Sequence, residues 1–439
     1  MKSGKVLFSA ILGIGLLGGS SAMAQRADYV RQVVTVNSGK FEYLPPFADH
    51  VTVQAFNPQS GAVNPFGTIY TQSGQAIVIS GATAFVAAQD SIVKFDLNTM
   101  QRLGAVRDSG LAQIALAKGA LIVSKQYPVV SRFVEVLDTA TLGVIARIEG
   151  ISGDCGGITL AGDTVYVAVN GGWMGTGGKL AVIDPATWTL KTEVDLGAGA
   201  LGISSLFAYN GKVVSVNKTP YGVTGAGSVT LYNPADRTFN NVPLAHTIGM
   251  GTGVKGNLLY LMVDNGIGSF NLSTLAVEEA AIIPDPGSSL FRYFTSAVLD
   301  TLDNRIYANI GDYITSGTCL VTTLAGDSVT SFATGISSDA VAIDYRSYPA
   351  GLTGNHAPAL TVQVYPNPVT ELLQVSLGPD CSRGRMFVID AMGRVVLSAA
   401  HSDMADCQVM ISCGDWPAGL YHLVWEASGK RAAVTFVKR

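Results

Sequence analysis

The residues best suited to chemistry in this sequence are aromatic and apolar side chains that interrupt glycine-rich, polar stretches. Such stretches between two apolar runs predict loops. Trp and Tyr combine a large apolar area with a polar group, which suits an amphipathic ligand or a protein partner. A single ring could simply pack against its own loop, but Trp173 follows Gly171 and Gly172, which offer few local packing partners. The candidate binding residues are Tyr127, Trp173, Met174, Tyr221, Arg292, Tyr293 and Tyr313, with Met250 and Phe291 in similar segments.

Evidence for catalysis is weaker. His50 falls in a predicted strand and His246 in a predicted loop, and neither lies beside a Ser or Cys motif. The sequence contains no G-x-S-x-G nucleophile motif and no EF-hand calcium loop. Asp154, Asp312 and Asp339 are scattered, whereas an enzyme would need its acids to converge. We therefore expect a non-enzymatic protein with no metal and no cofactor.

Cysteine usage leaves the disulfide state open. The odd number of cysteines, five, prevents complete intramolecular pairing. Cys407 and Cys413 are close in sequence and form the most plausible pair, with buried free thiols as the alternative. No Cys or His spacing resembles a zinc site.

The loops that carry the rings recur at a regular spacing. Asn170, Asn217, Asp264 and Gly311 each open such a loop and follow one another at intervals of 47 residues. An apolar run precedes each loop and another follows it, as in VYVAVN from Val165. A period in this range indicates a propeller, a solenoid or another array.

The second apolar run of each unit ends at a turn-forming residue. Asn and Asp side chains cap such turns by accepting backbone hydrogen bonds. One strand follows each turn and one precedes each unit, so that a unit has the four short strands of a propeller blade. The seven turn positions are Asn57, Asp96, Asp138, Asp184, Asn233, Asn271 and Thr323.

These signals predict a seven-bladed β-propeller over residues 25–350. Six blades begin near Gln75, Gln113, Cys155, Ile203, Gly253 and Thr295. The seventh combines an innermost strand at 339–345 with strands at 30–36, 50–57 and 62–69, which joins both ends of the domain and leaves no open sheet edge. Because neighbouring strands alternate in direction, the loops with the candidate residues and the connections between blades share one face.

Composition and the N-terminal segment place the protein outside the cytoplasm. Hydrophobic residues make up 48% of the 439 positions and charged residues 14%, and no basic stripe suggests a nucleic acid partner. Residues 1–24 predict a secretory signal peptide, with Lys2 and Lys5 before an apolar core and Ala22-Met23-Ala24 at the cleavage site. The apolar core is too short for a stable span, so we expect no transmembrane segment in the mature chain.

The C-terminal part loses the repeat. Residues 351–361 form a Gly- and Pro-rich linker. Residues 362–439 contain six or seven short strands, which indicate a small immunoglobulin-like β-sandwich. The expected fold class is therefore all-β, a seven-bladed propeller followed by this sandwich.

Two family resemblances support this organisation. Tyr166–Asn170 followed by Leu180–Thr187 resembles the YVTN-type propeller repeat of bacterial surface and periplasmic proteins, and the likeness extends over roughly 300 residues. It implies a fold and not a function. The C-terminal segment resembles the sorting domain of type IX secretion substrates in Bacteroidota. Its motif residues are Tyr365, Pro366, Asn367 and Pro368, then Asp390, Gly393 and Arg394, then Pro417, Gly419 and Tyr421, and Lys438 near the end.

The sorting-domain resemblance implies a route and partners. The chain would pass through the periplasm and the outer membrane to the cell surface or the medium. The type IX machinery and a sortase would act on residues 362–439, with cleavage in or near the linker.

Three functions remain open for the propeller. The leading hypothesis is a non-catalytic ligand-binding module; a weaker resemblance to surface propellers of gut Bacteroidota that capture vitamin B12 makes a corrinoid one candidate ligand. The second is an adhesin or scaffold for a protein or glycan. The third is a lactonase- or lyase-type enzyme. An apolar and aromatic cleft favours the first, a flat face the second, and converged carboxylates with a metal the third.

Overall fold

The computed structural model describes residues 28–42, 46–220, 223–347, 362–377, 384–392, 394–401, 407–427 and 430–439. The chain divides into two compact units, Met1–Ser347 and Tyr348–Arg439, which are treated separately below. The predicted signal peptide and the linker at 351–361 lie outside the described residues.

The described part of the first unit contains seven four-stranded antiparallel sheets and three short 3-10 helices. The helices are η1 (Gly172–Met174), η2 (Ala198–Ala200) and η3 (Ser288–Leu290). In sheet order the strands are β28 (Ser338–Arg346), β1 (Tyr29–Asn37), β2 (Val51–Phe56) and β3 (Val63–Ile69); β4 (Gly74–Ser80), β5 (Thr83–Ala88), β6 (Ser91–Asp96) and β7 (Gln101–Arg107); β8 (Leu111–Ala117), β9 (Ala120–Lys125), β10 (Val134–Asp138) and β11 (Val144–Ile148); β12 (Cys155–Ala161), β13 (Thr164–Val169), β14 (Lys179–Asp184) and β15 (Thr189–Asp195); β16 (Ile203–Tyr209), β17 (Lys212–Asn217), β18 (Gly227–Asn233) and β19 (Thr238–Leu244); β20 (Ile248–Lys255), β21 (Leu258–Val263), β22 (Gly266–Asn271) and β23 (Ala276–Ile283); β24 (Tyr293–Asp300), β25 (Arg305–Gly311), β26 (Ser316–Thr323) and β27 (Ser328–Ile336).

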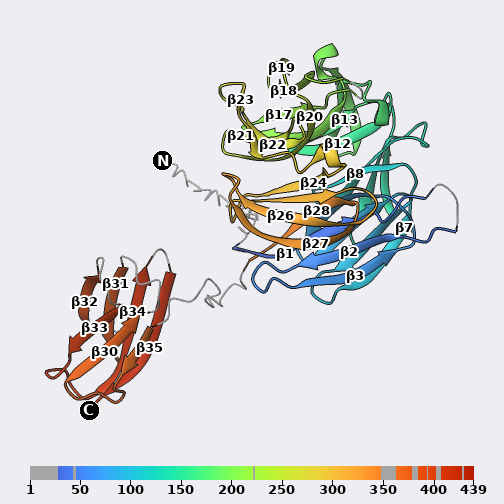
Figure 1. Ribbon diagram of the computed structural model, residues 1–439. Coiled ribbons are helices and arrows are strands. Elements are labelled where there is room, and N and C mark those ends of the chain that lie inside the picture. Colours follow the sequence, from blue (N-terminus) through green and yellow to red (C-terminus); the bar gives the residue numbers. More distant parts are fainter. Residues whose placement is uncertain are drawn as a thin grey trace, which may run out of the picture. The chain divides into compact units, whose positions relative to one another are not determined.

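The first strands of the sheets form a closed ring. Each contacts the next in the order β28, β4, β8, β12, β16, β20 and β24, and β24 contacts β28 again. The later strands of each sheet lie progressively further from the ring (Figure 1). This is the arrangement of a β-propeller, and the predicted fold class is confirmed.

The ring closes by pairing the two ends of the unit. β1 pairs with β28 in antiparallel register, with Val34 opposite Ala342, and the two strands lie side by side in Figure 1. The seventh sheet therefore combines one C-terminal strand with three N-terminal strands, as the sequence predicts. This pairing gives β1 a partner on both sides and completes the seventh four-stranded sheet.

A buried polar cluster ties the closing strands to a neighbouring sheet. Asp344 is fully buried. It accepts a hydrogen bond of 2.8 Å from the Gln32 side chain and forms an ion pair with Arg346. The Gln32 amide also donates to the carbonyl of Leu97, at 3.1 Å, in the turn after β6. Leaving a buried polar group of such a cluster without a partner would lower the folding stability.

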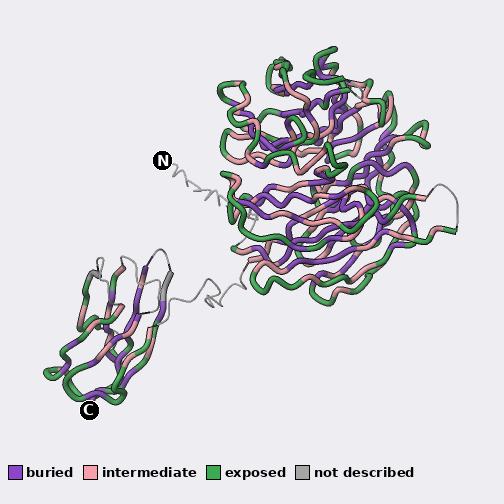
Figure 2. Tube along the Cα trace, in the orientation of Figure 1, coloured by how far each residue is buried: buried purple, intermediate pink, exposed green. Residues whose placement is uncertain are grey.

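Apolar side chains fill the space between neighbouring sheets. Phe85 and Ile92 of one sheet pack with Leu121 and Leu137 of the next, and all four are buried. The central strands read as nearly continuous buried runs, whereas the outermost strands and the loops are exposed (Figure 2). The core is thus a ring of apolar layers between sheets.

The predicted turn residues act as caps. Six of the seven positions are Asn or Asp, and in each the side chain accepts the backbone N–H two residues later, as Asp96 does from Asn98 at 2.7 Å. At the seventh, the Thr323 hydroxyl accepts the N–H of Ala325 at 3.2 Å. The repeated Asx signal therefore marks the same turn in every sheet.

One predicted strand start is wrong. β20 begins at Ile248, five residues before Gly253. The β20–β21 pairing contains two register shifts between Ile248 and Gly253. Bulges insert residues and break the alternation of apolar and polar side chains, so the GMGTG segment did not resemble a strand.

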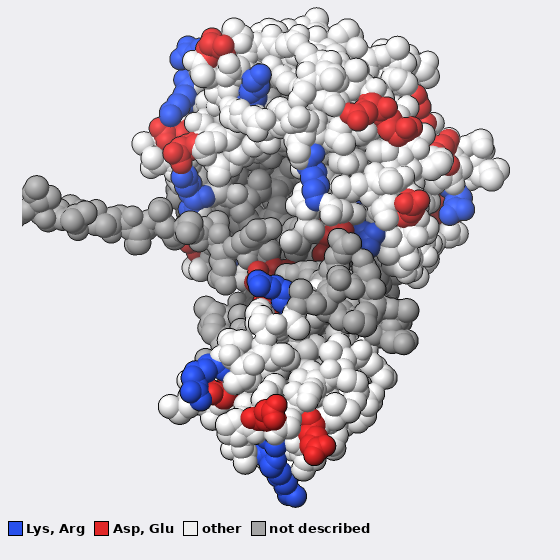
Figure 3. Space-filling view, turned by 90° about the vertical axis from the view of Figure 1, so that its left-hand side faces the viewer, with Lys and Arg blue, Asp and Glu red and all other residues white. Residues whose placement is uncertain are grey.

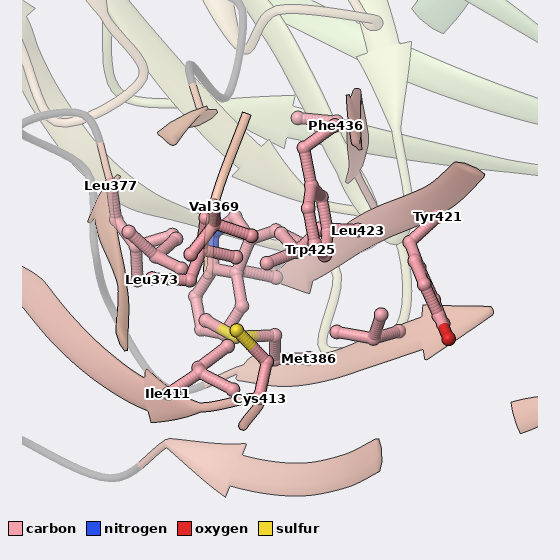
Figure 4. Close-up of a cluster of buried hydrophobic side chains, with 14 residues drawn as sticks. Val369, Leu373, Leu377, Met386, Ile411, Cys413, Tyr421, Leu423, Trp425 and Phe436 are labelled. Atoms are coloured by element: carbon pink, nitrogen blue, oxygen red, sulfur yellow. The ribbon is translucent and has the colours of Figure 1, made fainter. Parts of the chain in front are cut away.

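The second unit is a two-layer sandwich. One sheet contains β29 (Val362–Tyr365), β30 (Leu372–Leu377) and β33 (Gln408–Ser412); the other contains β32 (Val395–His401), β31 (Gly384–Asp390), β34 (Gly419–Ala427) and β35 (Lys430–Lys438). Side chains of both sheets point toward one another around the fully buried Trp425, among them Leu373, Ile411 and Met386 (Figure 4). The predicted C-terminal β domain is confirmed.

The predicted disulfide is wrong. Cys407 is disulfide-bonded, but Cys413 is a free thiol buried in the core of the sandwich. Its thiol contacts the carbonyl of Glu371 at 3.4 Å. Closeness in sequence did not identify the pair, because Cys413 follows β33 and faces the core. Cys155 and Cys319 are also free and buried.

We expect Asp344→Ala to destabilise the first unit by about 3 kcal/mol, because the change removes a partner of the partly buried Arg346 guanidinium and of the buried Gln32 amide. Urea denaturation measures the loss. The matched control is Asp163→Ala, which removes an exposed pair with Lys118 and should leave the midpoint unchanged. Equal effects of the two changes would contradict the role of Asp344 in ring closure.

Candidate ligand-binding site

Large exposed apolar side chains gather on one face of the first unit. We call this the loop face: the loops between the second and third strands of each sheet, the connections between sheets and the adjoining strand ends. All other large apolar side chains that are exposed in the described first unit lie on outermost strands, such as Leu103 and Phe239. The exposed apolar residues of the loop face are Phe41, Tyr70, Tyr127, Val130, Trp173, Met174, Leu201, Val223, Met250, Leu290, Phe291, Tyr313 and Ile314.

Exposed apolar side chains that gather on one face can mark a binding site. The side of the molecule drawn in Figure 3 instead shows acidic and basic side chains scattered over the described surface, without a continuous patch of either sign. The exposure pattern therefore points to the loop face as the binding face.

A cavity of about 470 Å³ lies within the ring of first strands. All seven first strands contribute to its wall, because each presents one edge of its sheet to the centre. Its lining is mixed. The apolar wall includes Ile77, Leu206, Phe207, Met250 and Met262, and the polar residues are Gln75, Gln113, Ser204, Ser205, Lys218, Ser296 and Asp339. The volume lies in the range of small-molecule sites.

A second cavity, of about 230 Å³, adjoins the first. The two cavities have five lining residues in common: Gln75, Gln113, Gly157, Ser204 and Lys218. The second cavity adds residues from the loop face, including Gln126, Asn170, Trp173 and Gly202. We call the first the central cavity and the second the mouth cavity.

Trp173 is positioned by the loop after β13. Asn170 accepts the N–H of Gly172 at 3.0 Å and donates to the carbonyl of Ile203 at 3.0 Å, which fixes the start of η1. Gly172 has φ of +64°, and a Cβ there would lie 2.4 Å from a carboxylate oxygen of Asp154. Only glycine fits this turn. Trp173 consequently lies at the loop surface, 75% exposed, and lines the mouth cavity.

Two other predicted rings form a pair. The centroids of Tyr293 and Tyr313 are 6.2 Å apart, within the range of interacting aromatic rings. Tyr313 has φ of 64°, a conformation that bulky residues seldom adopt. Burial, together with the nearby charge of Asp339, raises the pKa of the Tyr313 hydroxyl. The Tyr293–Tyr313 pair lies near the sheet that contains Asp339, but neither ring lines either cavity.

Asp339 is the acidic residue of the central cavity. It is on β28, and its carboxylate accepts a hydrogen bond from the Ser38 hydroxyl. Burial raises the pKa of Asp339 to about 6, although hydrogen bonds from Ser38 and Ser337 act in the opposite direction. The carboxyl therefore titrates close to neutral pH.

The remaining predicted residues are dispersed over the loop face. Tyr127, Met174 and Arg292 are exposed and line neither cavity. Tyr221 lies outside the described residues. Met250 lines the central cavity, and Phe291 is 73% exposed. The structure thus brings Trp173 and Met250 to the cavities and leaves the other described candidates on the surrounding face.

The groups considered for catalysis have local partners. Asp312 caps its own turn through the N–H groups of Ile314 and Thr315, which lower its pKa to about 2. His246 pairs with Asp264 at 2.5 Å, and the His50 ring packs against Tyr70. Within the described residues, no group of three or more His, Cys, Asp or Glu is arranged to hold a metal ion.

Sequence reasoning missed most of the cavity wall. Gln75, Gln113, Ser204 and Phe207 lie on first strands, and Lys218 follows β17. The wall residues lie near the starts of the first strands in successive blades, one to four per strand. Aligning the blades on their turn residues would have located these positions, but the search for aromatic loops did not.

The sorting-motif residues make short-range contacts within the sandwich. Asn367 donates to the carbonyl of Thr435 at 3.2 Å and accepts the N–H of Val437 at 2.9 Å, so it fastens the segment after β29 to β35. Asp390 accepts the backbone N–H of Arg394 at 3.0 Å and pairs with its guanidinium. The hydroxyl of Tyr421 donates to the carbonyl of Pro417 at 2.8 Å.

The other motif residues differ in exposure and placement. Gly419 begins β34, Lys438 ends β35 as a buried residue, and Tyr365 is 45% exposed. Gly393 lies outside the described residues.

Comparison with known families identifies this second unit. Residues 363–439 match the family described as the secretion system C-terminal sorting domain. The C-terminal unit is a type IX sorting domain. The chain is therefore handled by that secretion system and is delivered to the cell surface or secreted. No helix in the described residues is long and apolar enough to span a membrane.

Comparison with solved structures supports the fold of the whole chain. The chain is similar to the extracellular domain of a one-component system from B. thetaiotaomicron, with 13% identity and a TM-score of 0.52, over 92% of this chain and 57% of that one. The chain thus spans little more than half of that structure, and the likeness concerns fold only. PorZ, a surface component of the type IX secretion system of Porphyromonas gingivalis, matches with 11% identity and a TM-score of 0.37 over 88% of this chain and 73% of that one. No curated protein matches the sequence.

We expect Asp339→Asn to stabilise the first unit at neutral pH. The unfolded carboxyl has a pKa near 3.9, so between about pH 4 and 6 the folded state binds more protons, and stability falls as the pH rises. The amide stays neutral, and the variant should exceed the wild type by about 2 kcal/mol at pH 7.5 and match it near pH 3.5.

Urea denaturation at the two pH values measures this difference. Asp312→Asn serves as a control of opposite sign, because the lowered pKa of Asp312 means that its charged form stabilises the fold at neutral pH. An Asp339→Asn effect that does not change with pH would contradict the burial of the charged carboxyl.

Proposed function

We propose that the first unit is a non-catalytic capture module that holds an amphipathic small molecule in the central and mouth cavities. The observation that carries this proposal is the pair of adjoining cavities inside a ring of seven first strands. The mouth cavity is lined in part by residues of the face that exposes large apolar side chains. Concave, largely preformed spaces with a few convergent polar groups are the usual form of ligand sites.

The polar and apolar parts of the cavity are arranged for such a ligand. Met250, Met262 and Phe207 offer an adaptable apolar wall, and Met side chains in particular adjust to irregular shapes. Trp173 extends this surface at the opening. The ligand would place its apolar body in the central cavity and its polar end in the mouth cavity.

A macromolecular partner is the second candidate. The exposed apolar residues extend beyond the cavities to other loops of this face; Tyr70, Tyr127 and Phe291, for example, line neither cavity. A rim of this kind suits a protein or glycan that covers the face. The YVTN repeat type gives no preference between the two candidates, because propellers serve many functions.

The carboxylates do not favour the enzyme hypothesis. Asp312 is engaged in its own turn, and Asp339 hydrogen-bonds to Ser38. Asp154 lies beside Gly172 under the Trp173 loop. A lactonase or lyase would need such acids to face one reacting centre.

We expect Trp173→Ala to weaken ligand binding about tenfold without lowering the melting temperature, because the ring is largely exposed in the free protein. The measurement is a thermal-shift screen of the mature chain with corrinoids, haem and the neutral dye N-phenyl-1-naphthylamine. Bound ligand raises the melting temperature in proportion to ln(1 + [L]/Kd).

Phe239→Ala is the matched control, since Phe239 is an exposed ring on the outermost strand β19. It should leave binding unchanged. No shift with any small molecule would favour a macromolecular partner, and equal losses in the two variants would discard the loop face as the site.

We also expect a chain that lacks residues 363–439 to accumulate inside the outer membrane, because the first unit would no longer carry the sorting domain. Cell fractionation of a bacterium that has the type IX system measures the distribution. The full chain is the control. Export of the shortened chain at the normal level would contradict the dependence on this domain.

A further inference from the structure

The mouth cavity has an electrostatic preference. Among the described residues that line it, Lys218 is the one charged side chain, and no Asp or Glu contributes to the wall. The full chain carries a net charge of −4, whereas the wall of the mouth cavity has one cation and no acid among its described residues.

We propose that the mouth cavity binds an anionic group, and hence that the captured ligand is an anion with an apolar or aromatic body. This rests on the proposed function and specifies the polar end of the ligand. The group would be a carboxylate, sulfate or phosphate, which share the ability to accept charge-assisted hydrogen bonds.

Lys218 is held in place by its backbone and by glycines. Its N–H donates to the carbonyl of Gly202 at 3.0 Å. A Cβ at Gly202 would lie 3.6 Å from Lys218 Cγ, and one at Gly175 would lie 3.9 Å from Lys218 Cε. The aliphatic stem therefore crosses both glycines, each of which has positive φ. Lys218 is exposed as a whole residue, and it also lines both cavities.

The Lys218 ammonium makes no stabilising contact within the described part of the protein. No hydrogen bond or ion pair joins it to another described residue. In contrast, the buried Lys125 pairs with Asp108 and with Glu135 at 3.1 Å. An ammonium that has no partner and lines a cavity is available to a ligand anion.

Three amides also line the mouth cavity and can serve a ligand as donors or, through their carbonyl oxygens, as acceptors. The side chains of Gln75, Gln113 and Gln126 line the mouth cavity and make no side-chain hydrogen bond within the described residues. Each amide can donate two hydrogen bonds. Ser204 is already engaged, since its hydroxyl donates to the carbonyls of Val216 and Gly249. The free donors thus surround the space that Lys218 faces.

Asp339 would orient the ligand. It lines the central cavity from β28, whereas Lys218 follows a strand of the β16 sheet, and at least two first strands lie between β16 and β28 on either side of the ring. Asp339 does not line the mouth cavity. An anion would avoid the Asp339 side, and the apolar body would extend from Lys218 along Leu206 and Met250.

Two dyes of similar shape test the charge. 8-Anilinonaphthalene-1-sulfonate carries a sulfonate, and N-phenyl-1-naphthylamine is its neutral counterpart. Fluorescence titration of the mature chain gives Kd for each. We expect Lys218→Met to raise Kd for the sulfonate dye about tenfold and to leave Kd for the neutral dye within twofold. Lys218→Arg keeps the charge and should retain most of the sulfonate affinity.

Lys212→Met is the matched control. Lys212 is exposed at the other end of the same strand, β17, and its removal changes the net charge equally. It should leave both dyes unaffected. If Lys218→Met and the wild type have the same Kd for the sulfonate dye, the anion proposal is overturned. Binding of the neutral dye would in that case still support the capture function.

The other outcomes are also decisive. Equal weakening of both dyes in Lys218→Met would mean that Lys218 acts only through local structure, which overturns the proposal. Failure of the wild-type chain to bind either dye would overturn the capture function and this inference together. D-Glucuronate tested beside D-glucose then distinguishes a sugar acid from an apolar acid as the ligand class.

Discussion

The pairing of β1 with β28 is the interaction on which the first unit depends. Every sheet in a propeller packs against two neighbours, so an incomplete seventh sheet would expose the apolar faces of the sheets on both sides. The chain meets this need by pairing residues near position 34 with residues near position 342. The buried Asp344 cluster adds hydrogen bonds and an ion pair at the same seam. The cavity exists because this ring is closed.

The same closure explains why the wall of the central cavity is shared among all seven sheets. Each first strand contributes a few side chains to it. The proposed binding would therefore depend on the combination of wall residues and not on one local sequence. The charge pattern across the ring, with Lys218 and Asp339 on separate sheets, has this distributed character.

The sequence predicted the parts of the fold that have local chemical causes. Asp96, Asp184 and their equivalents cap the same turn in each blade, and this signal repeats because every blade must reverse direction at that point. The seventh sheet followed from the need to cover an edge. The sorting domain was recognised from motifs whose residues, such as Asn367 and Tyr421, make specific contacts.

Other features could not be predicted in this way. The start of β20 was hidden by bulges, and the disulfide partner of Cys407 depends on tertiary packing. The residues of the cavity wall were not predicted, because a Gln or Lys at the end of a strand has no local sequence signature. Such a residue lines a cavity only because the six other sheets face it. Trp173 was found because an aromatic ring among glycines is conspicuous by itself.

The order of synthesis gives the closing pair a consequence for export. β28 completes the sheet that contains β1, β2 and β3, and it is the last strand of the unit to be made. Until it arrives, β1 has an unpaired edge, and the ring remains open however many intervening sheets have formed. The ring therefore cannot close before residues 338–346 are available, and the sorting domain at residues 363–439 follows them in the chain. A first unit with a closed ring can thus form before the domain that directs export is complete.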